Sequence, residues 1–85
     1  MIVFIKGKLV EISENFLVID ANGIGYICYI TLQSYEKYSG SANNEISIST
    51  YYHVTDSSQT LFGFVDQLEK DVFMLLIGVS GIGPK

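Results

Sequence analysis

The residues with the most specific chemical pattern lie in the run VSGIGPK at residues 79–85. Gly81 and Gly83 lack a β-carbon, so the backbone there can approach a ligand closely. Pro84 suits the first turn of a helix, where free amides and the helix dipole bind anions such as phosphate. Ile82 would pack inward, and Lys85 would add a charge-assisted contact. The run therefore predicts a phosphate-binding turn, with a plain helix-to-turn exit as the alternative.

Four other polar residues could have a functional role, and each has a simpler structural explanation. Lys6 and Lys8 share one face of an expected strand and could meet backbone phosphate or form a solvated edge. Asp56 lies in a polar hairpin tip, where Asp is also a common turn residue. His53 has no second histidine or cysteine ligand beside it, so we expect it to be exposed, with neither a metal nor a catalytic role.

Composition predicts one small globular domain. The chain has 85 residues, of which 48% are hydrophobic and 16% charged, so its core is feasible but thin. Its five basic residues are all lysine and its nine acids give a net charge of −4, which argues mildly against a protein that grips duplex DNA. Cys28 is the sole cysteine, so we expect no disulfide and a cytoplasmic location. No ATP-binding loop or nucleophile-base set is visible, and we expect neither catalysis nor a metal or other cofactor.

Hydrophobic periodicity predicts five short strands with one helical turn, residues 34–38, between the third and the fourth. Gly7 in the first strand indicates a bulge or a sharp bend. Asn22 and Gly23 predict a type I′ hairpin turn. The fourth strand alternates strictly, which indicates one wet face. This order is that of an OB-fold, a partly open Greek-key barrel. The expected strands cover residues 2–12, 16–20, 24–32, 46–54 and 59–64.

The period changes to helical after Asp66. Asp66 and Glu69 form a capping-box-like pair and, with Asp71, indicate helix-start chemistry rather than a metal cluster. We expect a helix over about residues 67–77 that Gly78 ends. The fold class is therefore mainly β, with a barrel domain over residues 1–64. We expect residues 65–85 to form the first helix and turn of an incomplete helix-hairpin-helix.

Taken together, these features resemble the amino-terminal part of the RuvA family. The similar segments are the opening IKGKL, the NGIGY turn, the fourth strand with its tip, QTLFGF, and the lead helix with its hairpin, at residues 5–9, 22–26, 52–56, 59–64 and 73–85. The resemblance implies a non-catalytic, homotetrameric or octameric subunit that binds four-way Holliday junctions in recombination, DNA repair and the SOS response. It also implies an ATP-driven RuvB-type motor, recruited through a domain absent here, and a RuvC-type resolvase as partners.

The resemblance also assigns roles to residues. Gly81, Ile82, Gly83 and Lys85 would hold DNA phosphates, and Asp56 would stand in the acidic pin that helps to separate strands. The family pin often has two adjacent acids, whereas here Ser57 follows the acid. The family chain continues through the rest of this hairpin, a second hairpin and the motor-binding domain.

Two further functions stay open at this point. A single-strand-binding OB module would stack bases on aromatic side chains and would need basic groove residues, which are scarce beyond the first strand. A purely oligomerising barrel is compatible with the acidic charge balance. We expect most of the aromatics concerned to serve as core or subunit contacts: Tyr26, Tyr29, Tyr51, Tyr52 and Phe62.

Overall fold

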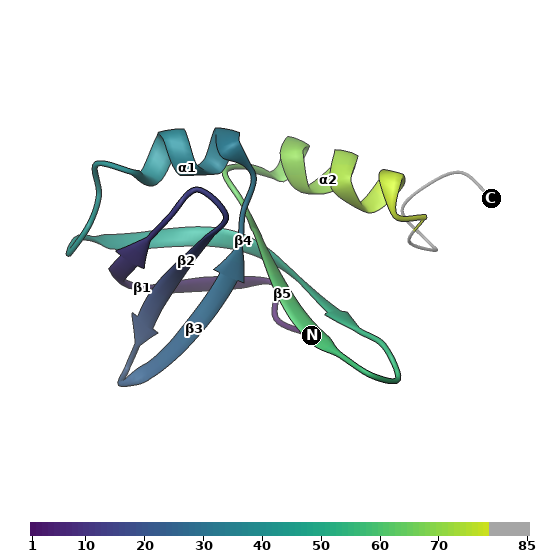
Figure 1. Cartoon of the computed structure of the whole chain (residues 1–85), viewed down its shortest axis with the longest axis horizontal. Helices are drawn as coiled ribbons and strands as arrows, with labels where there is room; N and C mark the ends of the chain where they lie inside the picture. Colours follow the sequence, from purple (N-terminus) through teal and green to yellow (C-terminus); the bar gives the residue numbers. More distant parts are fainter. Residues whose placement is uncertain (79–85) are drawn as a thin grey trace.

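The computed structural model describes residues 1–78 and consists of a closed five-stranded barrel with two helices on one side of it (Figure 1). The predicted hairpin at residues 79–85 lies outside the described residues. The elements in chain order are β1 (Phe4–Ile12), β2 (Phe16–Ala21), β3 (Ile24–Tyr29), α1 (Leu32–Tyr38), β4 (Glu45–Val54), β5 (Gln59–Phe64) and α2 (Gln67–Leu76).

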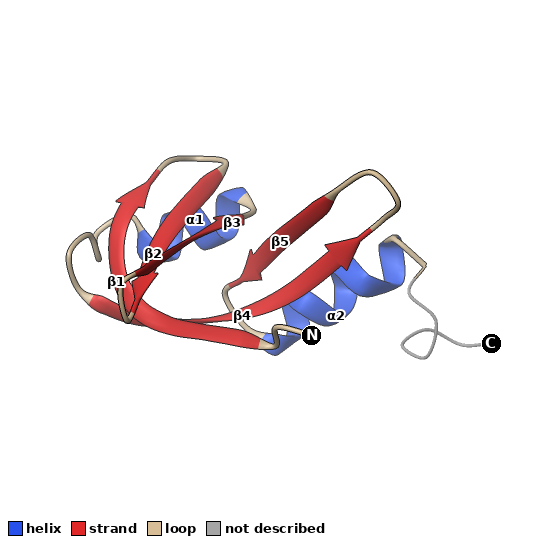
Figure 2. Ribbon diagram, turned by 90° about the horizontal axis from the view of Figure 1, so that it is seen from below, coloured by secondary structure: helices blue, strands red, loops and turns tan. Residues whose placement is uncertain are grey.

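The barrel closes in the order β1-β2-β3-β5-β4, as the OB-fold prediction requires (Figure 2). β1 is shared: its first half pairs with β4 and its second half with β2, both antiparallel. Closure comes from a short parallel pairing of β3 with β5, in which Tyr29 is opposite Phe62. The hairpin prediction is confirmed, because Asn22 and Gly23 both adopt positive φ, 54° and 87°.

The core forms from alternate strand residues that point into the barrel, as the two-residue period of a strand dictates. α1 closes one end: Tyr38 is buried and donates a hydrogen bond to the carbonyl of Ser47 at 3.3 Å. Among the described residues no helix is long and apolar enough to cross a membrane. The buried strand residues include Ile5, Leu9, Leu17, Ile19, Cys28, Ile46, Ile48 and Leu61.

The expected bulge does not lie at Gly7. The register of β1 against β2 shifts between Leu9 and Glu11 instead. Gly7 is buried in regular pairing with β4, and its missing side chain makes room for the carbonyl of Asp20. The glycine therefore marks a close approach of two strands, which is the other meaning of glycine inside a strand.

The third strand is shorter than expected, because the chain turns into α1 earlier. Thr31 is the N-cap of α1, and its hydroxyl accepts a hydrogen bond from the amide of Ser34 at 3.1 Å. Thr31 and Leu32, expected at the end of the strand, therefore belong to the helix start. Threonine favours this position because its side chain satisfies a free amide of the first turn.

The outer face of β4 is wet only in its first half. In the second half Phe73 of α2 covers the strand, with its ring centroid 6.3 Å from that of Tyr51 and 4.9 Å from that of Phe62. His53 lies in the same cluster, with its ring centroid 5.8 Å from that of Tyr51, and it is half-buried. The expectation of an exposed His53 is therefore wrong, because alternation distinguishes two faces of a strand but does not reveal what packs on the outer one.

The predicted helix is confirmed at both ends. Its N-cap is Asp66, whose carboxylate accepts from the amide of Glu69 at 2.9 Å. It ends at Leu76, and Gly78 follows with φ 74°, a conformation that glycine adopts without steric cost.

Candidate nucleic-acid interface

The two lysines of β1 lie together on the outer surface of the barrel, as predicted, but acids surround them. Lys6 Nζ is 4.0 Å from Glu45 Oε1, and both side chains are mostly exposed. Lys8 is paired across the sheet with Glu45 on one side and Asp20 on the other. An exposed ion pair contributes only about 0–1 kcal/mol, so Lys6 could exchange Glu45 for a phosphate. The surrounding acids nevertheless weaken the local positive potential.

The β4–β5 tip extends beyond the barrel (Figure 2) and carries Asp56. Its turn is held by the residues on either side. The Thr55 amide donates to the Ser58 carbonyl at 2.8 Å, the two hydroxyls are 2.9 Å apart, and the Ser58 amide donates to Thr55 Oγ1 at 3.1 Å. Within the described residues no hydrogen bond engages the Asp56 carboxylate. The turn therefore does not depend on Asp56, which leaves its charge exposed at the tip.

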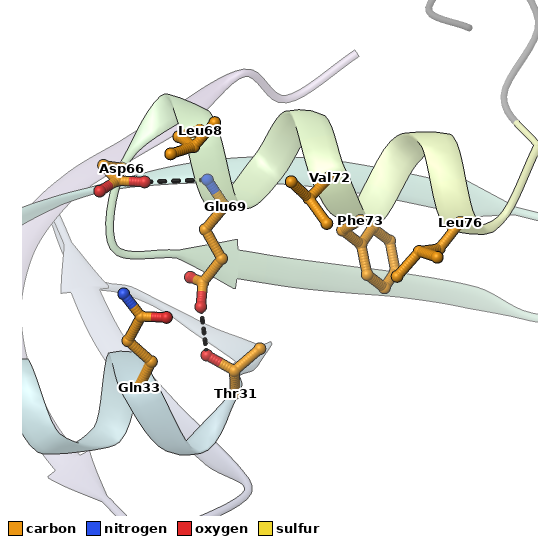
Figure 3. Close-up of a pocket in the computed structure, with 8 residues that line it drawn as sticks. All are labelled: Thr31, Gln33, Asp66, Leu68, Glu69, Val72, Phe73 and Leu76. Carbon is orange, nitrogen blue, oxygen red and sulfur yellow. Dashed lines mark hydrogen bonds between the residues drawn. The ribbon is translucent and has the colours of Figure 1, made fainter.

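A groove of about 320 Å³ runs between α2 and the start of α1 (Figure 3). Its α2 wall is apolar, and Leu68 and Leu76 are 72% and 81% exposed. Thr31 and Gln33 of α1 form the opposite side.

Glu69 crosses from α2 to α1, a connection that the sequence did not reveal. Its carboxylate accepts a hydrogen bond from Thr31 Oγ1 at 2.5 Å (Figure 3). It also accepts from Ser34 Oγ at 2.8 Å and from the amide of Val65 at 2.9 Å. A capping box would direct the carboxylate to the Asp66 amide instead. The predicted box is thus half right: Asp66 caps the helix, whereas Glu69 joins it to the rest of the molecule. The described residues contain no cluster of potential metal ligands.

The aromatic residues are mostly engaged inside the protein. Tyr26 and Tyr52 pack against the core, and the Tyr52 hydroxyl is 2.6 Å from Gln59 Oε1. Tyr51 and Phe62 pack under α2, and Tyr29 is 6.5 Å from Phe62 between ring centroids. The expectation of contacts inside the protein is confirmed for Tyr26, Tyr51, Tyr52 and Phe62, whereas Tyr29 is 42% exposed. A role in subunit contacts stays a prediction.

Burial changes the acid-base properties of two residues near the core. It raises the pKa of the Cys28 thiol from 9.0 to about 12, so this cysteine stays protonated and inert at neutral pH. Burial also raises the pKa of Tyr38, and the nearby carboxylates of Glu69 and Asp66 add to that shift. Neither group is suited to act as a nucleophile or ligand.

The barrel and its strand order define an OB-fold, an architecture that binds nucleic acids in many proteins. The chain belongs to the RuvA family, because the model of the family described as RuvA N terminal domain matches residues 1–63. It is 42% identical over 81 residues to the Holliday junction branch migration complex subunit RuvA of Streptococcus uberis, covering 95% of this chain and 40% of that protein.

Proteins of the same name from two other bacteria are similar over nearly the whole chain. The protein from Bacteroides thetaiotaomicron is 41% identical over 83 residues, which are 98% of this chain and 40% of that protein. The protein from Cytophaga hutchinsonii is 38% identical over 84 residues, 99% of this chain and 41% of that protein. The chain thus spans about two fifths of the length of these relatives.

Proposed function

We propose that this chain is the barrel and lead-helix part of a non-catalytic subunit that binds four-way DNA junctions by their backbone phosphates. The observation that carries this function is the 42% identity, over 95% of the chain, to a protein named as a Holliday junction branch migration complex subunit. The structure supports it with an OB-type barrel followed by α2, the helix that precedes the GIGPK run in the sequence. The sole cysteine is compatible with a cytoplasmic location.

The contacts with DNA would be distributed over three places. Gly81, Ile82, Gly83 and Lys85 would hold phosphate through backbone amides and one ammonium group. Lys6 and Lys8 would add weaker backbone contacts, and Asp56 would act as a single-acid pin. Because one copy has a net charge of −4, affinity would have to come from several copies acting together, as in a tetramer or octamer. An ATP-driven RuvB-type motor and a RuvC-type resolvase would be the protein partners.

A chimera tests this function. Residues 1–85 would replace the matched region of the Streptococcus uberis protein, which supplies the segment that follows. We expect the chimera to bind a four-way junction below micromolar concentration and about tenfold or more tightly than a linear duplex of equal length. The 85-residue chain alone should bind more weakly than about 10⁻⁶ M, the tight end of non-specific duplex binding. Gel-shift titrations across a salt series measure both.

A substitution in the chimera tests the phosphate turn. Gly83→Val should lower junction affinity about tenfold because a branched side chain blocks the approach of phosphate. The matched control is Gly40→Val, since Gly40 has open space around its α-carbon and no positive φ. A folded chimera without junction preference would refute the proposed function. Equal affinity of the Gly83 and Gly40 variants would refute the phosphate role of the turn.

A further inference from the structure

The orientation of α2 on the barrel depends on two contact regions. One is apolar and lies toward the end of the helix, where Met74 is buried and Phe73 packs on Phe62 and Phe64. The other is polar and lies in the first turn, where Glu69 meets α1. Most of the remaining apolar side chains of α2 are exposed, so they contribute little to fixing the helix. A helix held at one region could tilt about it, whereas two regions fix its direction.

The polar region, which we name the Glu69 joint, consists of Glu69, Thr31, Ser34 and Val65. Both carboxylate oxygens are used: Oε1 accepts from Ser34 Oγ and the Val65 amide, and Oε2 accepts from Thr31 Oγ1. Ser34 is fully buried, and its hydroxyl would lose its acceptor if the carboxylate were removed. Hydrogen bonds to an ionised acceptor are shorter and stronger than neutral ones. The joint therefore connects three segments of the chain through one side chain.

The geometry of α2 determines where the chain goes after Gly78. Without the joint the helix could tilt about its contact at Phe73, which follows Glu69 by four residues, or about 6 Å along the axis. A tilt of about 10° would move the first turn by about 1 Å and would turn the helix axis by the same angle. Binding sites lose function when their supporting elements are misplaced by about 1 Å. Loss of the joint would therefore change the direction in which the chain leaves the helix.

We propose that Glu69 is a positioning residue for DNA binding, which rests on the junction-binding function proposed above. Its carboxylate fixes α2 against α1 and thereby sets the direction in which the helix presents the GIGPK segment to a phosphate. Four-way junctions require several hairpins to meet their arms at once, whereas a linear duplex does not. Loss of the joint should therefore reduce junction selectivity more than affinity for duplex.

The orientation can be measured in the 85-residue chain without DNA. Spin labels would be placed at Ser47 on the barrel and at Leu68 in the first turn of α2, both exposed, in a Cys28→Ala background. We expect Glu69→Ala to broaden or shift the distance distribution between the labels. The matched control is Asp71→Ala, since the Asp71 carboxylate bonds only to Gln67 of the same helix among the described residues. That control removes the same charge from α2 and should leave the distribution unchanged.

Two milder variants keep the test decisive if Glu69→Ala unfolds the chain. Ser34→Ala removes one donor from the joint, and Glu69→Gln removes the charge but keeps the shape. Each should broaden the distance distribution less than Glu69→Ala does. The double variant should broaden it by less than the sum of the two single variants, because both substitutions act on the same hydrogen bond. An unchanged distribution in folded variants, or a lower melting temperature without any change of distribution, would overturn the positioning role.

The DNA readout uses the chimera. Glu69→Ala should reduce the ratio of junction affinity to duplex affinity about tenfold, while duplex affinity changes less than about twofold. Equal losses for both DNAs would overturn the positioning role. If the unmutated chimera has no junction preference, the proposed function fails, and so does the role of Glu69 in DNA binding. The spin-label distances would still decide separately whether Glu69 orients the helix.

Discussion

The α-carbon of Gly7 in β1 lies so close to the carbonyl oxygen of Asp20 in β2 that a β-carbon on Gly7 would overlap that oxygen. The same β-carbon would lie 2.8 Å from Cγ2 of Ile19. β1 is paired with both β2 and β4, so it cannot move away from one neighbour without disturbing the other. Gly7 is therefore required by the packing of the barrel and not by its own backbone conformation.

Gly7→Ala should lower the free energy of unfolding by about 2–3 kcal/mol, as overpacking of a tight core does. Gly25→Ala is the control, since a β-carbon there would meet only Cγ1 of Val18, at an ordinary 3.8 Å. The control should change stability by less than about 0.5 kcal/mol. Urea denaturation followed by circular dichroism measures both, and equal stabilities of the two variants would contradict the close approach.

The Thr50 side chain connects β4 to the first residues of the chain by a hydrogen bond. Its side chain is fully buried, and its hydroxyl donates to the Ile2 carbonyl at 2.8 Å. Thr50→Val keeps the volume but leaves that carbonyl without its donor, so we expect a loss of about 1–2 kcal/mol. Thr60→Val is the matched control, because the Thr60 side chain makes no hydrogen bond within residues 1–78. Equal stability changes in chemical denaturation would show that the hydroxyl contributes nothing.

The stability of the fold should fall at alkaline pH because of Cys28. Its pKa is 9.0 when unperturbed and about 12 in the folded protein, so the folded state holds the proton more tightly. The stabilisation is complete below pH 9 and is lost as pH rises toward 12. Three units at 1.36 kcal/mol each amount to about 4 kcal/mol over that range.

Cys28→Ala isolates this effect, because the raised pKa of Tyr38 acts with the same sign in both proteins. Denaturation in reducing buffer at pH 8 and pH 10.5 should show a smaller loss for the variant than for the unmodified chain. Native Cys28 should also resist alkylation at pH 8, since the buried thiol is protonated. Identical pH dependence in the two proteins would rule out the buried thiol as the cause.

Asp56 should oppose DNA binding at the β4–β5 tip. In a tetramer four copies of Asp56 would lie near the junction crossover. Salt screens charges only weakly at separations below a Debye length of roughly 8 Å, so the four carboxylates would repel nearby phosphates. In the chimera, Asp56→Asn should keep the fold and tighten junction binding about two- to threefold by relieving that repulsion. It should also change the branch-migration rate with the RuvB motor present. If Asp56→Lys proves as harmless as Asp56→Asn, the residue is only part of a polar turn.

Much of the fold was predictable because its signals are local. Apolar runs and, in β4, strict two-residue alternation located the five strands. Asn22 and Gly23 marked the hairpin, and Asp66 and Gly78 marked the two ends of α2. Each signal depends on backbone chemistry within a few residues: positive φ at a turn, a carboxylate that meets a free amide, or a period that matches strand or helix geometry. The order of the predicted elements, which is that of an OB-fold, then linked these local signals into one barrel.

The tertiary structure decided the features that depend on distant partners. The same alternation that located β4 could not reveal that Phe73 covers Tyr51, because the two residues approach only when α2 folds back on the barrel. Gly7 suggested a bulge, whereas the structure shows that it makes room for the carbonyl of Asp20 in β2. Glu69 looked like a local cap, yet its hydroxyl partners precede it by 38 and 35 residues. Sequence periodicity specifies which way a side chain points, whereas its neighbours are set only by how the elements pack.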